Sequence, residues 1–221
     1  MRDLNRPTAT VALHACRPAP PLLNGAGMTQ IPDEKAVLRR RALALRASES
    51  ARNSADSALK IRDHGLPLFA GLGPPGEVSG YLPIRDELSP LPLMEALLKA
   101  GWRLSLPVVT AKHSPLTFRR WQPGDALVSA PFGLQNPPQS VQAIQPSTLL
   151  VPIAVYDSSG FRIGYGGGYY DRTLALLRAA QNVTTIGIAY DCRQAPAVPR
   201  EAHDQRLDHI LTPSGVRSFG I

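Results

Sequence analysis

The sequence predicts a single α/β domain in which helices cover both faces of a mostly parallel central sheet, an α/β/α layered arrangement. Two observations predict it. Short apolar runs of strand character alternate along the chain with runs of helical periodicity. A glycine-rich segment, residues 164–168, also stands between one such strand and one such helix. Ligands of these sheets collect at the carboxyl ends of the strands, so we expect the functional residues in the loops that follow them.

Residues 1–31 are predicted to form a poorly ordered N-terminal extension, and residues 32–221 the folded domain. The extension contains several prolines and glycines, has three arginines against one acidic residue, and lacks helical periodicity. Such a composition is typical of organelle transit peptides, but the extension has no serine, which those peptides usually contain. A simpler interpretation is that translation begins at Met28.

Two helices are predicted at the start of the domain. The first runs from Asp33 to about Arg52, with apolar residues at i, i+4 and i+7 from Leu38 onward. The second runs over residues 54–64 and is expected to stop at Gly65, because glycine commonly follows the last turn of a helix. Residues 66–76, rich in glycine and proline, are then expected to form a loop.

The rest of the domain reads as alternating strands and helices. Two further helices are predicted at residues 92–100 and 170–180, and residues 122–145 read as a long loop because of their prolines and glycines. Apolar and β-branched runs predict strands over residues 77–82, 103–109, 116–121, 148–156, 184–190 and 209–212.

The segment from Arg162 to Arg172 carries the strongest functional signal. Four of the five residues 164–168 are glycine, and glycines can turn successive backbone N–H groups toward one anion. The helix that follows would add its unpaired first N–H groups. Tyr169 stands where a dinucleotide-binding pattern needs glycine, and no Gly-Lys-Ser/Thr ends the run as in a P-loop. We expect a phosphate site, the alternative being a flexible turn.

The net charge of +7 favours anionic partners, either nucleic acid or phosphate-bearing small molecules. The basic residues form no stripe with interleaved aromatic residues, so we expect small molecules, no nucleic acid, and a monomer or weak dimer. Cys16 and Cys192 form neither a Cys-x-x-Cys pair nor a metal spacing, which predicts a reducing, cytoplasmic location. No apolar run approaches the roughly 18 residues of a membrane helix, so no membrane partner is expected.

Four motifs together resemble one family. They are Tyr-Leu-Pro-Ile-Arg-Asp-Glu at 81–87, Val-Pro…Tyr-Asp at 151–157, Arg-Ile-Gly-Tyr-Gly-Gly-Gly-Tyr-Tyr-Asp at 162–171, and Pro-Arg-Glu-Ala-His-Asp at 199–204. In this order they resemble 5-formyltetrahydrofolate cyclo-ligase, also called 5,10-methenyltetrahydrofolate synthetase, over about residues 33–213. The resemblance implies a fold like that of sugar-phosphate isomerases and CoA-transferases (NagB/RpiA/CoA-transferase-like). It also implies ATP- and Mg²⁺-dependent cyclisation of 5-formyltetrahydrofolate to 5,10-methenyltetrahydrofolate, by phosphorylation of the formyl oxygen, with release of ADP and phosphate.

The resemblance also implies roles for individual residues. Asp171 and Asp204 would hold Mg²⁺, and Arg162 and Tyr169 would be catalytic. The folate would contact Leu82, Glu87, Tyr165, Gly166, Gly167, Gly168 and Tyr169. ATP would contact Lys35, Arg39, Arg162, Ile163, Gly164, Tyr165, Gly166, Gly167, Gly168, Tyr169 and Tyr170.

Each implied role has a plainer alternative. Asp171 is also a suitable acid for a helix N-terminus, and Asp204 a suitable residue for an Asx turn. Glu87 and Lys35 are equally compatible with solvent-facing positions, and His203 beside Asp204 is compatible with an inert loop histidine. These alternatives stay open at the level of the sequence.

Two residues depart from the family pattern. Gly167 stands where many members have a basic residue, which removes one point charge from the phosphates, and Asn136 stands where an acid is expected. Their effect on nucleotide and folate affinity is left open. Two other functions compete with the enzyme. One is a phosphate-binding relative of the isomerase or CoA-transferase type without cyclo-ligase activity, and the other is a nucleic-acid-binding module, which would leave the glycine run unexplained.

Overall fold

A computed structural model describes residues 31–220, and all structural statements below concern these residues. The predicted N-terminal extension, apart from Ile31, and Cys16 lie outside this range. The elements in chain order are α1 (Ile31–Gly71), β1 (Glu77–Ser79), α2 (Leu91–Lys99), β2 (Arg103–Val108), β3 (Thr117–Arg120), β4 (Val128–Ser129), the short 3₁₀ helix η1 (Pro131–Gly133), β5 (Gln135–Asn136), β6 (Ala143–Ile144), β7 (Thr148–Pro152), β8 (Val155–Tyr156), β9 (Arg162–Ile163), α3 (Tyr169–Ala180), β10 (Thr184–Ile188), η2 (Asp191–Arg193), β11 (His209–Thr212) and β12 (Gly215–Ser218).

The central sheet has eight strands in the order β12-β11-β10-β7-β1-β2-β3-β6. The five inner strands, from β11 to β2, are parallel, and β12, β3 and β6 are added antiparallel at the two edges. The chain goes from β1 to β2 on one side, and returns with β7 on the other side of β1. The direction of strand addition therefore reverses between β1 and β7, and such a reversal is where doubly wound sheets bind their ligands.

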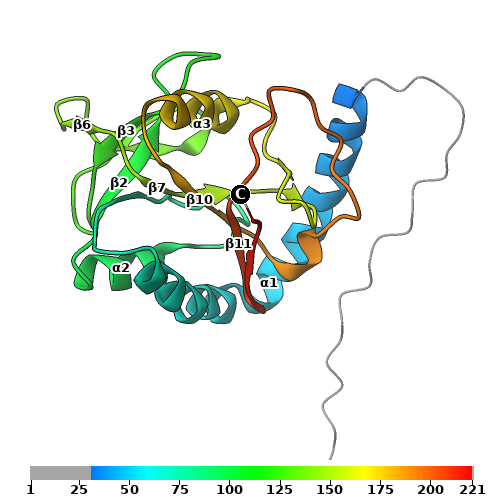
Figure 1. Ribbon diagram of the computed structural model, residues 1–221, viewed down its shortest axis with the longest axis horizontal. Coiled ribbons are helices and arrows are strands. Elements are labelled where there is room, and N and C mark those ends of the chain that lie inside the picture. Colours follow the sequence, from blue (N-terminus) through cyan, green and yellow to red (C-terminus); the bar gives the residue numbers. More distant parts are fainter. Residues whose placement is uncertain (1–30, 221) are drawn as a thin grey trace, which may run out of the picture.

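Helices cover both faces of this sheet, as Figure 1 shows with α3 above it and with α2 and the cyan second part of α1 below it. Side chains of β7 alternate between the two faces because successive residues of a strand point to opposite sides. Leu149 and Val151 pack in the cluster that contains Leu174 and Leu177 of α3, whereas Leu150 packs in the cluster that contains α1 and α2 residues. The predicted α/β/α class is confirmed.

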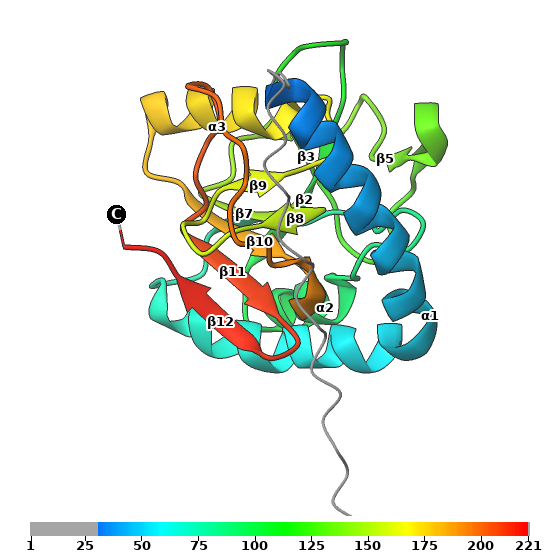
Figure 2. The ribbon, with the colours of Figure 1, turned by 90° about the vertical axis from the view of Figure 1, so that its right-hand side faces the viewer.

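The prediction of two helices followed by a loop at the start of the domain is wrong. The structure has one helix, α1, from Ile31 to Gly71, with Pro67 inside it. Gly65 does not end a helix: a Cβ there would lie 2.8 Å from a Leu93 methyl group, so glycine allows α1 to pack closely on α2. Figure 2 shows the blue first part of α1 passing β8 and β9, and its cyan second part lying beside α2 under the sheet.

Other element boundaries differ from the predicted ones because the pairing between strands sets them. The predicted strand 148–156 divides into β7 and β8, because β8 leaves the central sheet and pairs with β9. The predicted loop 122–145 contains β4, β5, β6 and η1. The sequence prediction also missed β12, which pairs antiparallel with β11 after a turn that ends at Gly215, where φ is +138°. None of the helices in the described part of the chain is long and apolar enough to cross a membrane.

Candidate active site

Glu87, one of the predicted site residues, lies at the carboxyl ends of β1, β7 and β10, next to the reversal in strand order. A small cavity of about 10 Å³ marks this edge. It is lined by the loop after β1 (Tyr81, Glu87, Leu88), the end of β7 (Pro152, Ile153) and the segment at the end of β10 (Ile188, Ala189, Tyr190, Arg193). Three segments that are distant in the sequence therefore meet in one place.

The loop after β1 is folded tightly around Glu87. The Glu87 side chain is buried, and its Oε2 accepts a hydrogen bond from the Ile84 backbone N–H at 2.9 Å. The Tyr81 hydroxyl donates to the Leu88 carbonyl oxygen at 2.6 Å. Burial, and secondarily the charge of Glu87, raises the pKa of Tyr170 at the start of α3. Glu87 is thus not a solvated loop acid, and it lies within electrostatic reach of the segment that follows the glycine run. Leu82 lies in the same loop, half-buried.

Asp157 positions the chain between β8 and β9. Its Oδ1 accepts hydrogen bonds from the N–H groups of Ser159 at 2.8 Å and Phe161 at 3.1 Å, and its Oδ2 accepts one from Val198 at 3.1 Å. All three bonds are to backbone groups, and the carboxylate is buried. This motif residue therefore shapes the turn into β9 and fixes the entry to the glycine run.

The glycine loop, residues 164–168, joins β9 directly to α3. Gly166 and Gly168 have φ of +95° and +64°, values that favour glycine. Gly168 is the residue before the first turn of α3, and within the described structure no side chain caps this helix. The first N–H groups of an α-helix have no partner inside the helix, so this end suits an anion. Ile163, just before the loop, is buried and Tyr165 within it is exposed.

Arg39 of α1 lies against the first half of the glycine loop. Its Nε donates to the Gly164 carbonyl oxygen at 2.8 Å. Its guanidinium carbon would be 3.2 Å from a Cβ on Gly166, so the two groups are in close contact. Burial lowers the pKa of Arg39, yet an arginine stays protonated at neutral pH. The loop thus has one positive charge held beside it by Arg39, which stands 125 residues before Gly164 in the chain.

Arg162 and Asp171 form an ion pair between β9 and α3. The Arg162 Nη2 and Asp171 Oδ1 are 2.9 Å apart, and the Arg162 side chain is only 4% exposed. Arg162 also donates to the Gln205 carbonyl oxygen, and Asp171 Oδ1 accepts from the Gln205 N–H at 3.0 Å. The pair therefore links the segment around the glycine loop to Gln205, the residue after Asp204.

Lys35 of α1 is held between two carboxylates of the 201–204 turn. Its Nζ lies 2.6 Å from Asp204 Oδ2 and 2.9 Å from Glu201 Oε2. Burial opposes the charge of Lys35, but hydrogen bonds and Coulombic attraction from Asp204 and Glu201 outweigh it, so its pKa is raised. Lys35 is not a surface lysine, and Asp204 is more than an Asx-turn residue, although its Oδ2 also accepts from the Glu201 N–H at 2.7 Å.

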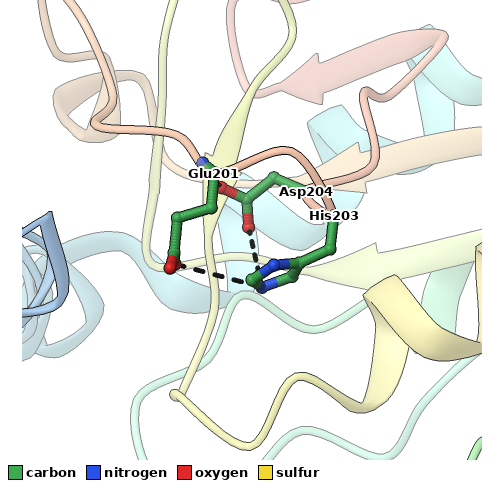
Figure 3. A group of neighbouring side chains, drawn as sticks. All are labelled: Glu201, His203 and Asp204. Carbon is green, nitrogen blue, oxygen red and sulfur yellow. Dashed lines mark hydrogen bonds and ion pairs between the residues drawn. The ribbon is translucent and has the colours of Figure 1, made fainter.

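Glu201, His203 and Asp204 form a compact cluster of metal-ligand types. Figure 3 shows their side chains converging, with His203 Nε2 3.9 Å from Glu201 Oε2 and 4.0 Å from Asp204 Oδ1. One ligand atom from each residue lies within 4.8 Å of the others. Among these three residues, the family resemblance implied a role only for Asp204. The sequence signal that could have indicated the cluster is the spacing of Glu201, which stands three residues before Asp204.

Tyr169 and Arg172 cover the last part of the glycine loop. A Cβ on Gly167 would lie 2.6 Å from a Tyr169 ring carbon, so this position has no space for a side chain unless the ring moves. Arg172 donates to the Gly167 carbonyl oxygen and lies 5.4 Å from the Tyr169 ring centroid. Asn136, the other departure from the family pattern, lies in β5 opposite Val128 of β4.

The fold and this site define a class of protein: a doubly wound α/β domain with an anion-binding type of glycine loop at the reversal of strand order. The comparison of sequences is more specific. A sequence model of the 5-formyltetrahydrofolate cyclo-ligase family matches residues 31–213, and the chain belongs to this family. The family and the class of enzyme predicted from the motifs are therefore confirmed.

Individual relatives agree with this assignment. The chain is 36% identical over 144 residues to the 5-formyltetrahydrofolate cyclo-ligase of Mycolicibacterium smegmatis, covering 62% of this chain and 73% of that one. It is 34% identical over 146 residues to that of Escherichia coli K12, covering 63% and 79%. Among solved structures, the 5,10-methenyltetrahydrofolate synthetase of Aquifex aeolicus matches with a TM-score of 0.69 and 27% identity, covering 85% of this chain and 93% of that one.

Proposed function

We propose that this protein catalyses the ATP- and Mg²⁺-dependent conversion of 5-formyltetrahydrofolate to 5,10-methenyltetrahydrofolate, with release of ADP and phosphate. One observation carries the proposal beyond the family assignment. The glycine loop enters α3 with Arg39 against it, and Asp171 accepts a hydrogen bond from the Gln205 N–H. The carboxylate of the neighbouring Asp204 holds Lys35, which stands one helical turn from Arg39 on α1. Anion donors and metal-ligand oxygens side by side are what a metal–nucleotide complex requires.

The chemistry explains the need for ATP. A formamide oxygen is a poor leaving group. Transfer of the γ-phosphoryl group to this oxygen forms an O–P bond and breaks the bond between the γ-phosphorus and the oxygen that stays on ADP. N10 of the folate then attacks the activated carbon, loses its proton, and phosphate departs with the former formyl oxygen. Such a reaction needs positioning and charge neutralisation rather than a protein nucleophile.

The residues around the glycine loop suit the phosphate groups. We assign Arg39 and the N–H groups of residues 164–170 to the phosphates of ATP, since the loop turns at Gly166 and Gly168 and ends at an uncapped helix within the described structure. Arg162 is almost fully buried and neutralised by Asp171. Its catalytic role in this proposal is therefore to hold the loop and Asp171 in place, while Tyr169 forms one wall beside the reacting group.

We assign Asp171 and Asp204 to a divalent cation. The carboxylates of Asp204 and Glu201 already hold a cation, the ammonium of Lys35, at 2.6 and 2.9 Å, which supports the assignment for Asp204. When bound, Mg²⁺ would neutralise the charge that develops on the transferred phosphoryl group. We propose that Lys35 then leaves Asp204 and pairs with a phosphate, which is feasible because Lys35 and Arg39 stand one helical turn apart on α1.

The folate is assigned to the cavity at the end of β1. Glu87 lines this cavity and carries a carboxylate that can accept hydrogen bonds from the N–H edge of a pterin. A volume of about 10 Å³ accommodates about one water molecule. The loop of residues 80–88, which contains Leu82, must therefore move apart from Tyr190 and the end of β7 to admit the ring.

The deciding experiment is the absorbance of the methenyl product. Purified protein is mixed with 5-formyltetrahydrofolate, Mg²⁺ and ATP, and parallel samples omit ATP or Mg²⁺. A rise that requires both supports the proposal, and Asp204→Asn should abolish it while the protein stays folded. Folded protein that binds ATP without any rise would refute the reaction, and would favour a phosphate-binding relative without cyclo-ligase activity.

A further inference from the structure

We propose that Arg172 is a second phosphate-binding cation of the glycine loop and supplies, from α3, the charge that Gly167 does not carry. This inference rests on the proposed function, because it assumes that phosphate groups bind at the loop. It concerns a residue outside the motif that predicted the ATP contacts.

The side chain of Arg172 folds back from the first turn of α3 onto the loop. Its Nη2 donates to the Gly167 carbonyl oxygen. Its Nη1 would be 2.8 Å from a Cβ on Gly168, the residue whose φ of +64° ends the loop. The guanidinium therefore lies over the last two glycines, whereas Arg39 contacts Gly164 and Gly166 at the other end. The two arginines flank the loop from different helices.

The charge of Arg172 is uncompensated among the described residues. Arg162 is paired with Asp171, and Lys35 with Glu201 and Asp204, so those positive charges are largely cancelled. In the described structure, the hydrogen bonds of Arg39 and Arg172 to the loop are to carbonyl oxygens, which carry no net charge. These two residues are therefore the cations at the loop that remain free to attract an anion.

The guanidinium of Arg172 also has unused donors. Its Nε is buried and has no hydrogen-bond partner among the described residues. Burying an unpaired donor is unfavourable unless a partner arrives. A phosphate group is a suitable partner, because a guanidinium presents adjacent N–H donors in a planar fork that matches phosphate oxygens. The N-terminus of α3 lies beside the same point and favours the same charge.

The surroundings of Gly167 explain why the charge comes from the helix. A Cβ at this position would be 2.6 Å from the Tyr169 ring, so a basic side chain here would displace Tyr169. Arg172 instead lies 5.4 Å from the centre of that ring, on which its guanidinium can rest without displacing it. The ring and the arginine occupy the space together.

A purely structural role for Arg172 makes a different prediction, and two variants separate the roles. Arg172→Gln keeps a donor for the Gly167 carbonyl oxygen but removes the charge. Arg172→Lys keeps the charge. A phosphate-binding role predicts that Arg172→Gln weakens binding about ten- to a hundredfold, the usual range for one lost charged hydrogen bond, and that Arg172→Lys recovers much of it. Arg217→Gln, an equal change of charge on the exposed strand β12, should have no effect.

Binding is measured by calorimetry on the full chain with MgATP, with AMP and with inorganic tripolyphosphate, and circular dichroism checks that each variant is folded. Loss for ATP and tripolyphosphate, with little change for AMP, supports the proposal. Equal binding of Arg172→Gln and the unmodified protein overturns it, and so does an unmodified protein that binds neither ATP nor tripolyphosphate. If tripolyphosphate binding depends on Arg172 but no methenyl product forms, the inference stands and the proposed reaction fails.

Discussion

Removal of the Glu201 carboxylate should strengthen ATP binding. In the structure, Glu201 and Asp204 together hold the Lys35 ammonium, and the proposed mechanism requires Lys35 to leave them for a phosphate. Glu201→Gln retains a hydrogen-bond acceptor but removes one of the two negative charges. It lowers the cost of releasing Lys35, and it also removes a charge that repels the nucleotide.

The magnitude follows from the exposure of the pair. Lys35 Nζ and Glu201 Oε2 are 2.9 Å apart, with side chains that are 13% and 35% exposed. Solvent screens such a pair, so its contribution is at most about 1 kcal/mol. If the energy of the Lys35–Glu201 pair opposes ATP binding, its loss lowers the dissociation constant of ATP by about fivefold. The effect should shrink as salt is added, because the charges are partly exposed to solvent.

The assay is calorimetric titration of the full chain with ATP at fixed Mg²⁺, together with Mn²⁺ binding followed by electron paramagnetic resonance. Glu95→Gln, an exposed acid on α2, is the matched control for the change in charge. Weaker ATP binding and weaker Mn²⁺ binding in Glu201→Gln would refute this reasoning. They would show that Glu201 is a metal ligand rather than a counter-ion that Lys35 leaves.

Three further outcomes are expected. Asp171→Ala leaves the buried Arg162 guanidinium unpaired and should lower the free energy of unfolding by about 3 kcal/mol in urea titrations, whereas Asp171→Asn, which keeps an acceptor, should cost clearly less. Gly65→Ala places a Cβ 2.8 Å from a methyl group of α2 and should lower the melting temperature, whereas Gly71→Ala, with no atom of the described structure within 4 Å of its Cβ, should leave it equal or higher. Burial lowers the pKa of His209 below its usual 6.5, only partly opposed by Asp208, so the unfolded chain binds more protons. Stability should therefore fall as pH drops below about 6.5, and His209→Gln should flatten this dependence; an unchanged slope would contradict it.

Several expectations from the sequence remain predictions. The boundary between the predicted N-terminal extension and the domain, the start of translation at Met28 and the cytoplasmic location stay predictions. The same holds for the monomer or weak dimer. The individual contacts with ATP, folate and Mg²⁺ are proposals that the experiments above address.

Local order was predictable from the sequence because it depends on neighbours along the chain. Apolar runs gave the inner strands β1, β2, β7, β10 and β11, with boundaries that differ by a few residues. The glycine run before Tyr169 predicted a loop that enters a helix, and the structure has α3 begin at Tyr169. The order of four motifs was specific enough to identify the family.

Gly65 shows where this local reasoning was wrong. A glycine after a helical run commonly marks an end, so two helices were expected. The structure continues α1 through this residue, because Gly65 faces Leu93 and the absence of a side chain allows α1 and α2 to pack closely. The meaning of a glycine thus depends on a contact with a residue that is distant in the sequence.

The sequence by itself determined the family and the layered class of the fold, and it supplied candidate residues for the site. Only the tertiary structure decided which basic side chains near the loop are paired with a carboxylate and which can attract an anion. Lys35 meets Glu201 and Asp204 across 166 and 169 residues of chain, and Arg162 is neutralised by Asp171. Arg39 and Arg172, by contrast, reach the loop without a carboxylate partner among the described residues. The physical reason is that Coulombic interactions depend on distance in space, which the order of residues along the chain does not specify.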